Sequence, residues 1–209
     1  MKRIVKDPEE RRQEIIDTSE ALFERRGYEN TTIDDIAQEM HVAKGLLYYY
    51  FESKEAILDV AIERFVEAAQ QTLHDIADAE EHNAVEKMSH VSQYLVSFWK
   101  KRRGLADYLH EEKNEYMHCK LAKRIVEKIS EPIAQIIRQG VTERVFTTKY
   151  PDEVAVVLVS MGDIGGERIS ALKNLSYEER IKRTKEARKD IAERILGARP
   201  GSFDVFEEL

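Results

Sequence analysis

Three consecutive tyrosines, Tyr48 to Tyr50, form the most distinctive run of chemically capable side chains in the sequence. A phenol donates a hydrogen bond to a phosphate oxygen or contacts a base edge, and an ammonium group binds a phosphate. Lys44 and Gly45 precede the tyrosines and Lys54 follows them. Glycine lets the backbone approach a ligand closely. These residue types at this spacing favour a local contact with nucleic acid.

Helices must position these side chains. The apolar residues of segment 9–26 recur at three-and-four spacing, which predicts a helix with one buried face that ends at Gly27. Thr32 carries a hydroxyl that can cap a short helix over 33–40, whose first turn holds two aspartates. We therefore expect a long helix followed by a short one.

A tight turn at residues 41–43 separates this short helix from a second one over 44–51. In the second helix, Leu47 and Phe51 face inward, whereas three adjacent tyrosines cannot all be buried. Two short helices joined in this way make a helix-turn-helix, whose second helix fits the major groove of DNA.

Short motifs run through residues 11–58 in a fixed order. They are Ala21-Leu22-Phe23, Gly27-Tyr28, Thr31-Thr32, Ile36-Ala37, Lys44-Gly45, Leu47-Tyr48, Tyr50-Phe51 and Ser53-Lys54-Glu55. This set closely resembles the DNA-binding domain of TetR-type (tetracycline repressor-like) transcriptional regulators, and it spans about a quarter of the chain.

The resemblance implies an all-α fold with an N-terminal three-helix helix-turn-helix DNA-binding domain (1–54), a larger helical ligand-binding and dimerisation domain (55–199) and a tail (200–209). It places phosphate contacts at Thr32, Tyr48, Tyr50 and Lys54, and base contacts at Lys44, Gly45, Leu46 and Tyr49. It further implies a homodimer on a double-stranded operator, released by a small-molecule effector.

Three positions depart from the family pattern. The family often has glycine where this chain has His41, serine or threonine where it has Ala43, and threonine where it has Leu46. Ala43 has no oxygen with which to cap the following helix, and such a loss typically costs about 0.5 to 2 kcal/mol. Leu46 cannot hydrogen-bond a base edge but can pack on a thymine methyl.

The remainder of the chain is also expected to be helical. A helix starting at Ser53 should run to about residue 77, a polar connection covers 78–84, and the next helix ends in a cationic turn. From 105 to 140 we expect a kink or a break at Pro132, because proline removes an amide donor. Further helices are expected over 151–173 and 177–196.

The helix that begins near residue 153 is apolar nearly all round, so it must be covered on two sides. With the final helix it is our candidate for a dimeric four-helix bundle, purely intrachain packing being the alternative. The proposed interface is Val154, Leu158, Met161, Gly165, Ile169, Leu172, Ile191 and Ile195. Asp163 interrupts this apolar run and should pair with an arginine or stay partly exposed.

Large side chains are concentrated in the middle of the chain, where the family keeps an inducer pocket. The candidate effector-binding residues are Tyr94, Phe98, Trp99, Tyr108, Tyr116 and Met117. Aromatic residues at helical spacing also occur in ordinary cores, so a packing role is the alternative for each of them.

Composition excludes several classes of protein. The net charge is −7, and residues 1–54 hold nine basic and twelve acidic side chains, so bulk positive charge cannot coat nucleic acid. A single cysteine, Cys119, makes no disulfide within the chain and fits a reducing cytoplasm. We find no signal peptide or membrane span and expect a cytoplasmic protein. A flexible arm with Lys2, Arg3 and Lys6 is a hypothesis for extra DNA contact.

No motif indicates an enzyme, a cofactor or a metal site. The sequence has no phosphate-binding glycine loop, no nucleophile motif and no paired zinc histidines. His74, His82 and His90 recur every eight residues, a spacing that does not keep one helical face. The remaining alternative is a helical ligand-binding or adaptor protein that has lost sequence-specific DNA binding, a reading that Ala43 and Leu46 favour.

Overall fold

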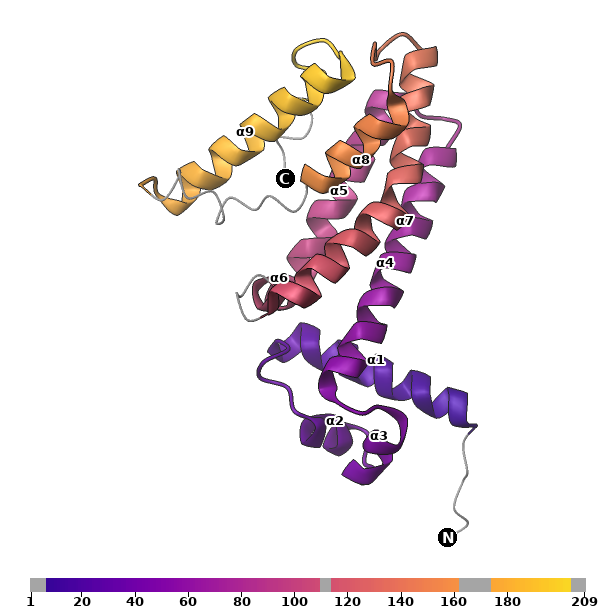
Figure 1. Ribbon diagram of the computed structural model, residues 1–209, viewed down its shortest axis with the longest axis vertical. Coiled ribbons are helices and arrows are strands. Elements are labelled where there is room, and N and C mark those ends of the chain that lie inside the picture. Colours follow the sequence, from indigo (N-terminus) through magenta and orange to yellow (C-terminus); the bar gives the residue numbers. More distant parts are fainter. Residues whose placement is uncertain (1–6, 110–113, 162–173, 204–209) are drawn as a thin grey trace. The chain divides into compact units, whose positions relative to one another are not determined.

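The structure, a computed structural model, describes residues 7–109, 114–161 and 174–203. Regular secondary structure in these ranges is entirely helical, which confirms the all-α fold (Figure 1). The helices are α1 (Pro8–Arg26), α2 (Ile33–Glu39), α3 (Lys44–Tyr50), α4 (Lys54–Asp78), α5 (Ala84–Lys101), α6 (Arg103–Leu109), α7 (Glu115–Thr142), α8 (Pro151–Met161) and α9 (Tyr177–Leu196).

The chain packs into two compact units. The first unit comprises Met1–Phe65 and Phe98–Cys119, and the second comprises Val66–Ser97 and Lys120–Leu209. Helix α6 packs against α1 and belongs to the first unit. The stretch that carries most of the candidate effector residues thus belongs to the same unit as α1, α2 and α3.

Helix α1 forms for the reasons visible in its sequence. The Asp7 side chain accepts hydrogen bonds from the amides of Glu9 and Glu10, and Pro8 occupies the first turn. Gly27 ends the helix with a φ of 82°, a value that favours glycine. The predicted apolar stripe is confirmed, since the buried residues of the helix are Ile15, Ile16, Ser19, Leu22 and Phe23.

The two helices that follow have different caps. Thr32 and Asp35 form a reciprocal capping box at the start of α2. Ala43 has the extended backbone of a cap residue but offers α3 no side-chain hydrogen bond, as expected. His41 in the turn between them adopts a φ of 54°, which explains why glycine suits this position. Leu47 and Phe51 are buried, so the predicted inward face of α3 is confirmed.

Helix α4 begins with the predicted cap. The Ser53 side chain accepts a hydrogen bond from the Ala56 amide at the start of α4, as expected for a cap. Of the kink or break expected at Pro132, the break does not occur, because α7 runs without interruption across it. Ile129 and Ile133 are buried on either side of the proline, so packing outweighs the single missing backbone hydrogen bond.

The end of the chain packs within the second unit. Helix α9 begins with a capping box between Ser176 and Glu179 and ends at Gly197, which has a left-handed φ of 63°. Phe203 is fully buried, its ring centroid lies 6.2 Å from that of Phe146, and its amide donates to Glu193. The described part of the tail therefore docks.

Some predictions concern residues outside the described ranges. These are the arm at Lys2, Arg3 and Lys6, the carboxylate of Asp163, and the interface residues Gly165, Ile169 and Leu172. In the ranges that are described, no helix is both long and apolar enough to cross a bilayer.

Candidate nucleic-acid interface

Helix α3 presents an aromatic face to solvent. The Tyr49 side chain is 80% exposed and that of Tyr48 is 50% exposed, values that are high for residues of this size. The Tyr50 ring lies edge-on to that of Tyr49 at 5.1 Å between centroids. A methyl group added at Gly45 would meet no atom within 4 Å, so packing in this unit does not require glycine there. As predicted, the three tyrosines are not all buried.

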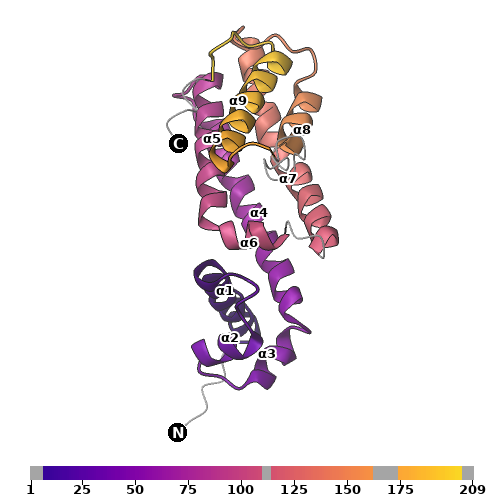
Figure 2. The same ribbon diagram turned by 90° about the vertical axis from the view of Figure 1, so that its left-hand side faces the viewer.

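The first unit holds this face in place. Helices α1 and α2 contact each other, as do α2 and α3, and Figure 2 shows α2 and α3 close together. Arg25 and Arg26 of α1 form ion pairs with Glu39 and Asp35 of α2. The Arg12 guanidinium lies 5.2 Å from the ring centre of Phe51, the residue that ends α3. The two short helices therefore rest on the long one.

Lys44 is exposed at the start of α3 but is paired. Its Nζ donates to Oδ2 of Asp34 at 2.8 Å and lies 5.9 Å from the ring centre of Tyr48. The hydrogen bond to Asp34 raises the pKa of the Lys44 ammonium above its ordinary value. Sequence reasoning missed Asp34, because no helical spacing links two residues on different helices.

Lys54 occupies a different environment from that expected of a phosphate ligand. Its Nζ donates to the backbone carbonyls of Tyr28 and Thr31 at 2.9 and 2.8 Å, and lies 4.0 Å from the ring centre of Tyr28. These contacts tie the first residue of α4 to the connection between α1 and α2. Sequence reasoning missed this anchoring role, because the acceptors are backbone oxygens more than twenty residues away.

The hydroxyl of Thr32 is part of the capping box. It accepts from the Asp35 amide at 3.1 Å and donates to Oδ2 of Asp35, whose other partner is the Thr32 amide at 2.8 Å. Both hydrogen bonds lower the pKa of the Asp35 carboxyl group, and the bond from the Thr32 hydroxyl has the larger effect. Thr32 is exposed, and Leu46 is half-buried in α3.

The candidate effector residues are distributed over both units. Tyr108 is buried against Tyr28, with ring centroids 4.2 Å apart. Phe98 and Trp99 stack edge-on at 5.4 Å, and the Arg102 guanidinium covers the Phe98 ring. Met117 is half-buried in the first unit, and Tyr94 belongs to the second. The side chain of Tyr116 lies outside the description.

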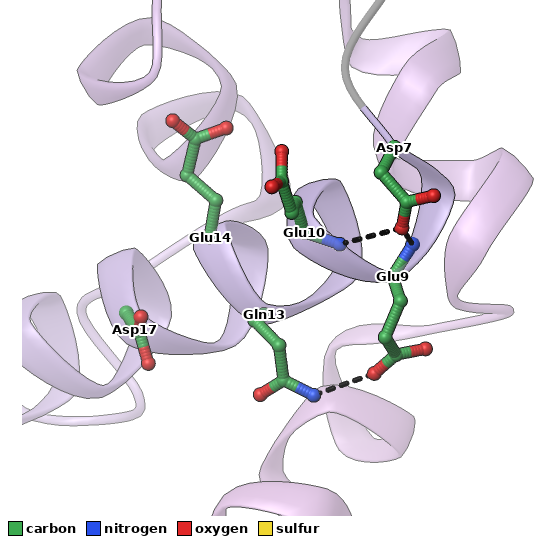
Figure 3. A pocket seen from close by; sticks show the side chains of 6 residues that line it. All are labelled: Asp7, Glu9, Glu10, Gln13, Glu14 and Asp17. Carbon is green, nitrogen blue, oxygen red and sulfur yellow. Dashed lines mark hydrogen bonds between the residues drawn. The ribbon is translucent and has the colours of Figure 1, made fainter.

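A hollow along the start of α1 has a volume of about 560 Å³. Figure 3 shows its lining side chains, Asp7, Glu9, Glu10, Gln13, Glu14 and Asp17. Carboxylates at this helix end suit the helix dipole and the Asp7 cap. They supply no donor to a phosphate, so this hollow is not part of the nucleic-acid interface.

In the described residues, no group of three histidine, cysteine or acidic side chains is placed to hold a metal ion. The rings of His82 and His90 do meet edge-on, 4.6 Å apart, although their spacing had indicated separate faces. His82 precedes α5, so the helical argument did not apply to it.

A comparison with known families assigns one segment within the first unit. Residues 15–61 match the family described as "Bacterial regulatory proteins, tetR family", a range that covers most of α1, all of α2 and α3, and the start of α4. The N-terminal domain of this chain belongs to the tetR family. The resemblance seen in its motifs is thereby confirmed.

Two curated transcriptional regulators are similar to part of this chain. The HTH-type transcriptional regulator HbdR of Aromatoleum sp. (strain CIB) is 37% identical over 93 residues, which are 43% of this chain and 40% of that protein. IcaR of Staphylococcus aureus (strain Newman), a negative transcriptional regulator of the biofilm operon icaADBC, is 41% identical over 51 residues, or 24% and 27% of the two chains. The chain thus spans less than half the length of both relatives.

A solved structure extends the likeness in fold beyond the tetR-family domain. A transcriptional regulator of the TetR/AcrR family from Thermobifida fusca YX-ER1 superposes with a TM-score of 0.58 at 22% identity, over 86% of this chain and 96% of that chain. At this identity the likeness concerns the fold alone, which agrees with the all-helical architecture.

Proposed function

We propose that this protein is a transcriptional regulator that binds a DNA operator through the exposed face of α3. The observation that carries the proposal is the exposure of Tyr48 and Tyr49 beside Lys44 and Gly45, in a segment that matches the tetR family. Phenol and ammonium groups suit phosphate oxygens and base edges, and a bare glycine lets the backbone enter the groove. Thr32, Leu46, Tyr50 and Lys54 complete the proposed contact set.

The active form is proposed to be a homodimer. Two recognition helices must lie one DNA turn apart, about 34 to 36 Å, to read the two halves of a pseudo-palindrome. Helices α8 and α9 contact each other and still leave Val156, Val157 and Ile191 more than 40% exposed. Such exposed apolar side chains support a contact with a second copy, to which Val154, Leu158, Met161 and Ile195 would add.

Repression and release by a small molecule complete the proposal. The negative regulator IcaR is among the relatives, which favours a repressor. The candidate effector residues include Trp99, the sole tryptophan of the chain, so its fluorescence offers a direct readout of ligand binding. If an effector favours the state that does not bind DNA, saturating operator must weaken effector binding by the same factor.

The proposal is tested by selecting sequences from a random duplex pool with the purified full chain. We expect enrichment of a palindrome with half-sites one turn apart. Tyr49→Ala should weaken binding to that sequence by about tenfold or more. Tyr150→Ala is the matched control, because Tyr150 is another exposed tyrosine and lies outside α3. Failure of the wild-type chain to enrich any sequence would favour the adaptor alternative instead.

A further inference from the structure

The helix-turn-helix segment has few cations in its sequence. Between Thr32 and Lys54 the sequence has only two basic residues with permanent charge, Lys44 and Lys54. Lys54 donates to two backbone carbonyls, and Lys44 is paired with Asp34. Attraction to phosphates depends on cations that can approach them, and here the Lys44 charge is offset by Asp34 while the Lys54 ammonium is held by carbonyl oxygens.

Asp34 lies in the first turn of α2, where its charge suits the helix dipole, but it takes no part in the capping box. The capping box at the start of α2 is made by Thr32 and Asp35. The Asp34 side chain is 56% exposed and reaches from α2 to the first residue of α3. An exposed ion pair of this kind contributes little to stability, typically about 0 to 1 kcal/mol. Its position beside the tyrosines gives it another consequence.

We propose that Asp34 is a specificity-determining residue, which lowers affinity for DNA of arbitrary sequence more than affinity for the operator. This inference rests on the proposed function. In a complex without base recognition, attraction between cations and phosphates supplies nearly all of the binding free energy. Lys44 must leave Asp34 to take part, and the carboxylate that remains then repels the neighbouring phosphates.

The operator complex differs because the ion pair need not break. A carboxylate that holds the ammonium can also direct it toward the acceptor edge of a guanine in the major groove. The contacts of Tyr48 and Tyr49 then add binding free energy that arbitrary DNA does not supply. Asp34 therefore acts as a positioning residue for Lys44 in the specific complex and as a repulsive group in the non-specific one.

The test compares Asp34→Asn with wild type on the selected duplex and on a random duplex of the same length, over a range of salt concentrations. We expect the variant to bind random DNA about threefold to fivefold more tightly, with a salt slope steeper by about 0.9 because one more phosphate is neutralised. Affinity for the selected duplex should stay level or fall. Asp17→Asn is the matched control, because it removes an exposed carboxylate that pairs with Arg64.

Two results would overturn the inference. One is an unchanged ratio of the two affinities, and the other is an equal gain in Asp17→Asn, which would indicate net charge alone. A Lys44→Gln background, in which Asp34→Asn should no longer steepen the salt slope, gives an independent reading if the single variant folds poorly. A wild-type chain that selects no sequence would remove the proposed function itself, an outcome distinct from normal selection with an unchanged ratio.

Discussion

At the scale of single residues, the ammonium group of Lys54 lies among two backbone carbonyls and the ring of Tyr28. Lys54→Met should lower the free energy of unfolding by about 1 to 3 kcal/mol, because part-buried carbonyls lose a charged donor. Urea denaturation measures this loss. Lys44→Met is the control, since Lys44 is exposed, and should change stability little. Equal stabilities for the two variants would contradict the anchoring role.

The capping box makes the first unit sensitive to acid. Hydrogen bonds from Thr32 depress the pKa of Asp35 below its ordinary value of 3.8. The stability that Asp35 contributes is therefore present above that value and is lost as pH falls through the depressed pKa.

Asp35→Asn should accordingly be less stable than wild type at neutral pH, and the gap should narrow as the pH falls below 3.8. Chemical denaturation at a series of pH values measures the gap. Asp17→Asn controls for the loss of one exposed carboxylate from the same unit. A gap that stays constant with pH would show that the charge of Asp35 does not contribute to the cap.

At the scale of elements, α3 lacks a side-chain cap although Ala43 has the backbone conformation of one, with φ −72° and ψ 141°. Ala43→Ser should stabilise the chain by about 0.5 to 2 kcal/mol by giving a helix amide an acceptor. Thermal unfolding measures this gain in stability. The same change at Ala21, an exposed interior position of α1, should instead be slightly destabilising.

The gain at Ala43 also bears on function. If α3 frays at its start, an added cap should tighten operator binding, because less conformational entropy is lost in the complex. A stabilised variant with weaker operator binding would indicate that the uncapped start of α3 has to rearrange on DNA.

At the scale of the whole molecule, the proposed homodimer depends on the exposed apolar residues of α8 and α9. The double variant Val157→Lys with Ile191→Lys should be monomeric at concentrations where wild type is dimeric, because it buries two charges in the contact. Light scattering after gel filtration measures the mass. Val96→Lys on α5 is the matched control, since Val96 is similarly exposed. A variant that stays dimeric would place the interface elsewhere.

The monomeric double variant should also bind the operator far more weakly than a variant that loses stability but remains dimeric. A monomer engages only one half-site and forfeits the effective concentration that links the second. A double variant that is monomeric but retains operator affinity would contradict the proposal that two recognition helices bind the two halves of a palindrome.

Much of the fold is written in local patterns. The buried stripe of α1, the Thr32 cap of α2 and the Ser176 cap of α9 involve residues a few positions apart, so helical periodicity and capping chemistry predict them. The exposed tyrosines follow from the same logic, because only part of a seven-residue helix can face a core. The family spacing of the motifs in 11–58 rests on these local constraints.

Other properties depend on residues that are distant in the chain. Lys54 meets the carbonyls of Tyr28 and Thr31, Asp34 meets Lys44, and Tyr108 packs on Tyr28. Periodicity carries no information about such contacts, since it describes one helix at a time. The sequence by itself determined the helices and the exposed tyrosines of α3. Only the tertiary structure decided which charges remain available to DNA, because the pairing of charges depends on distance in space.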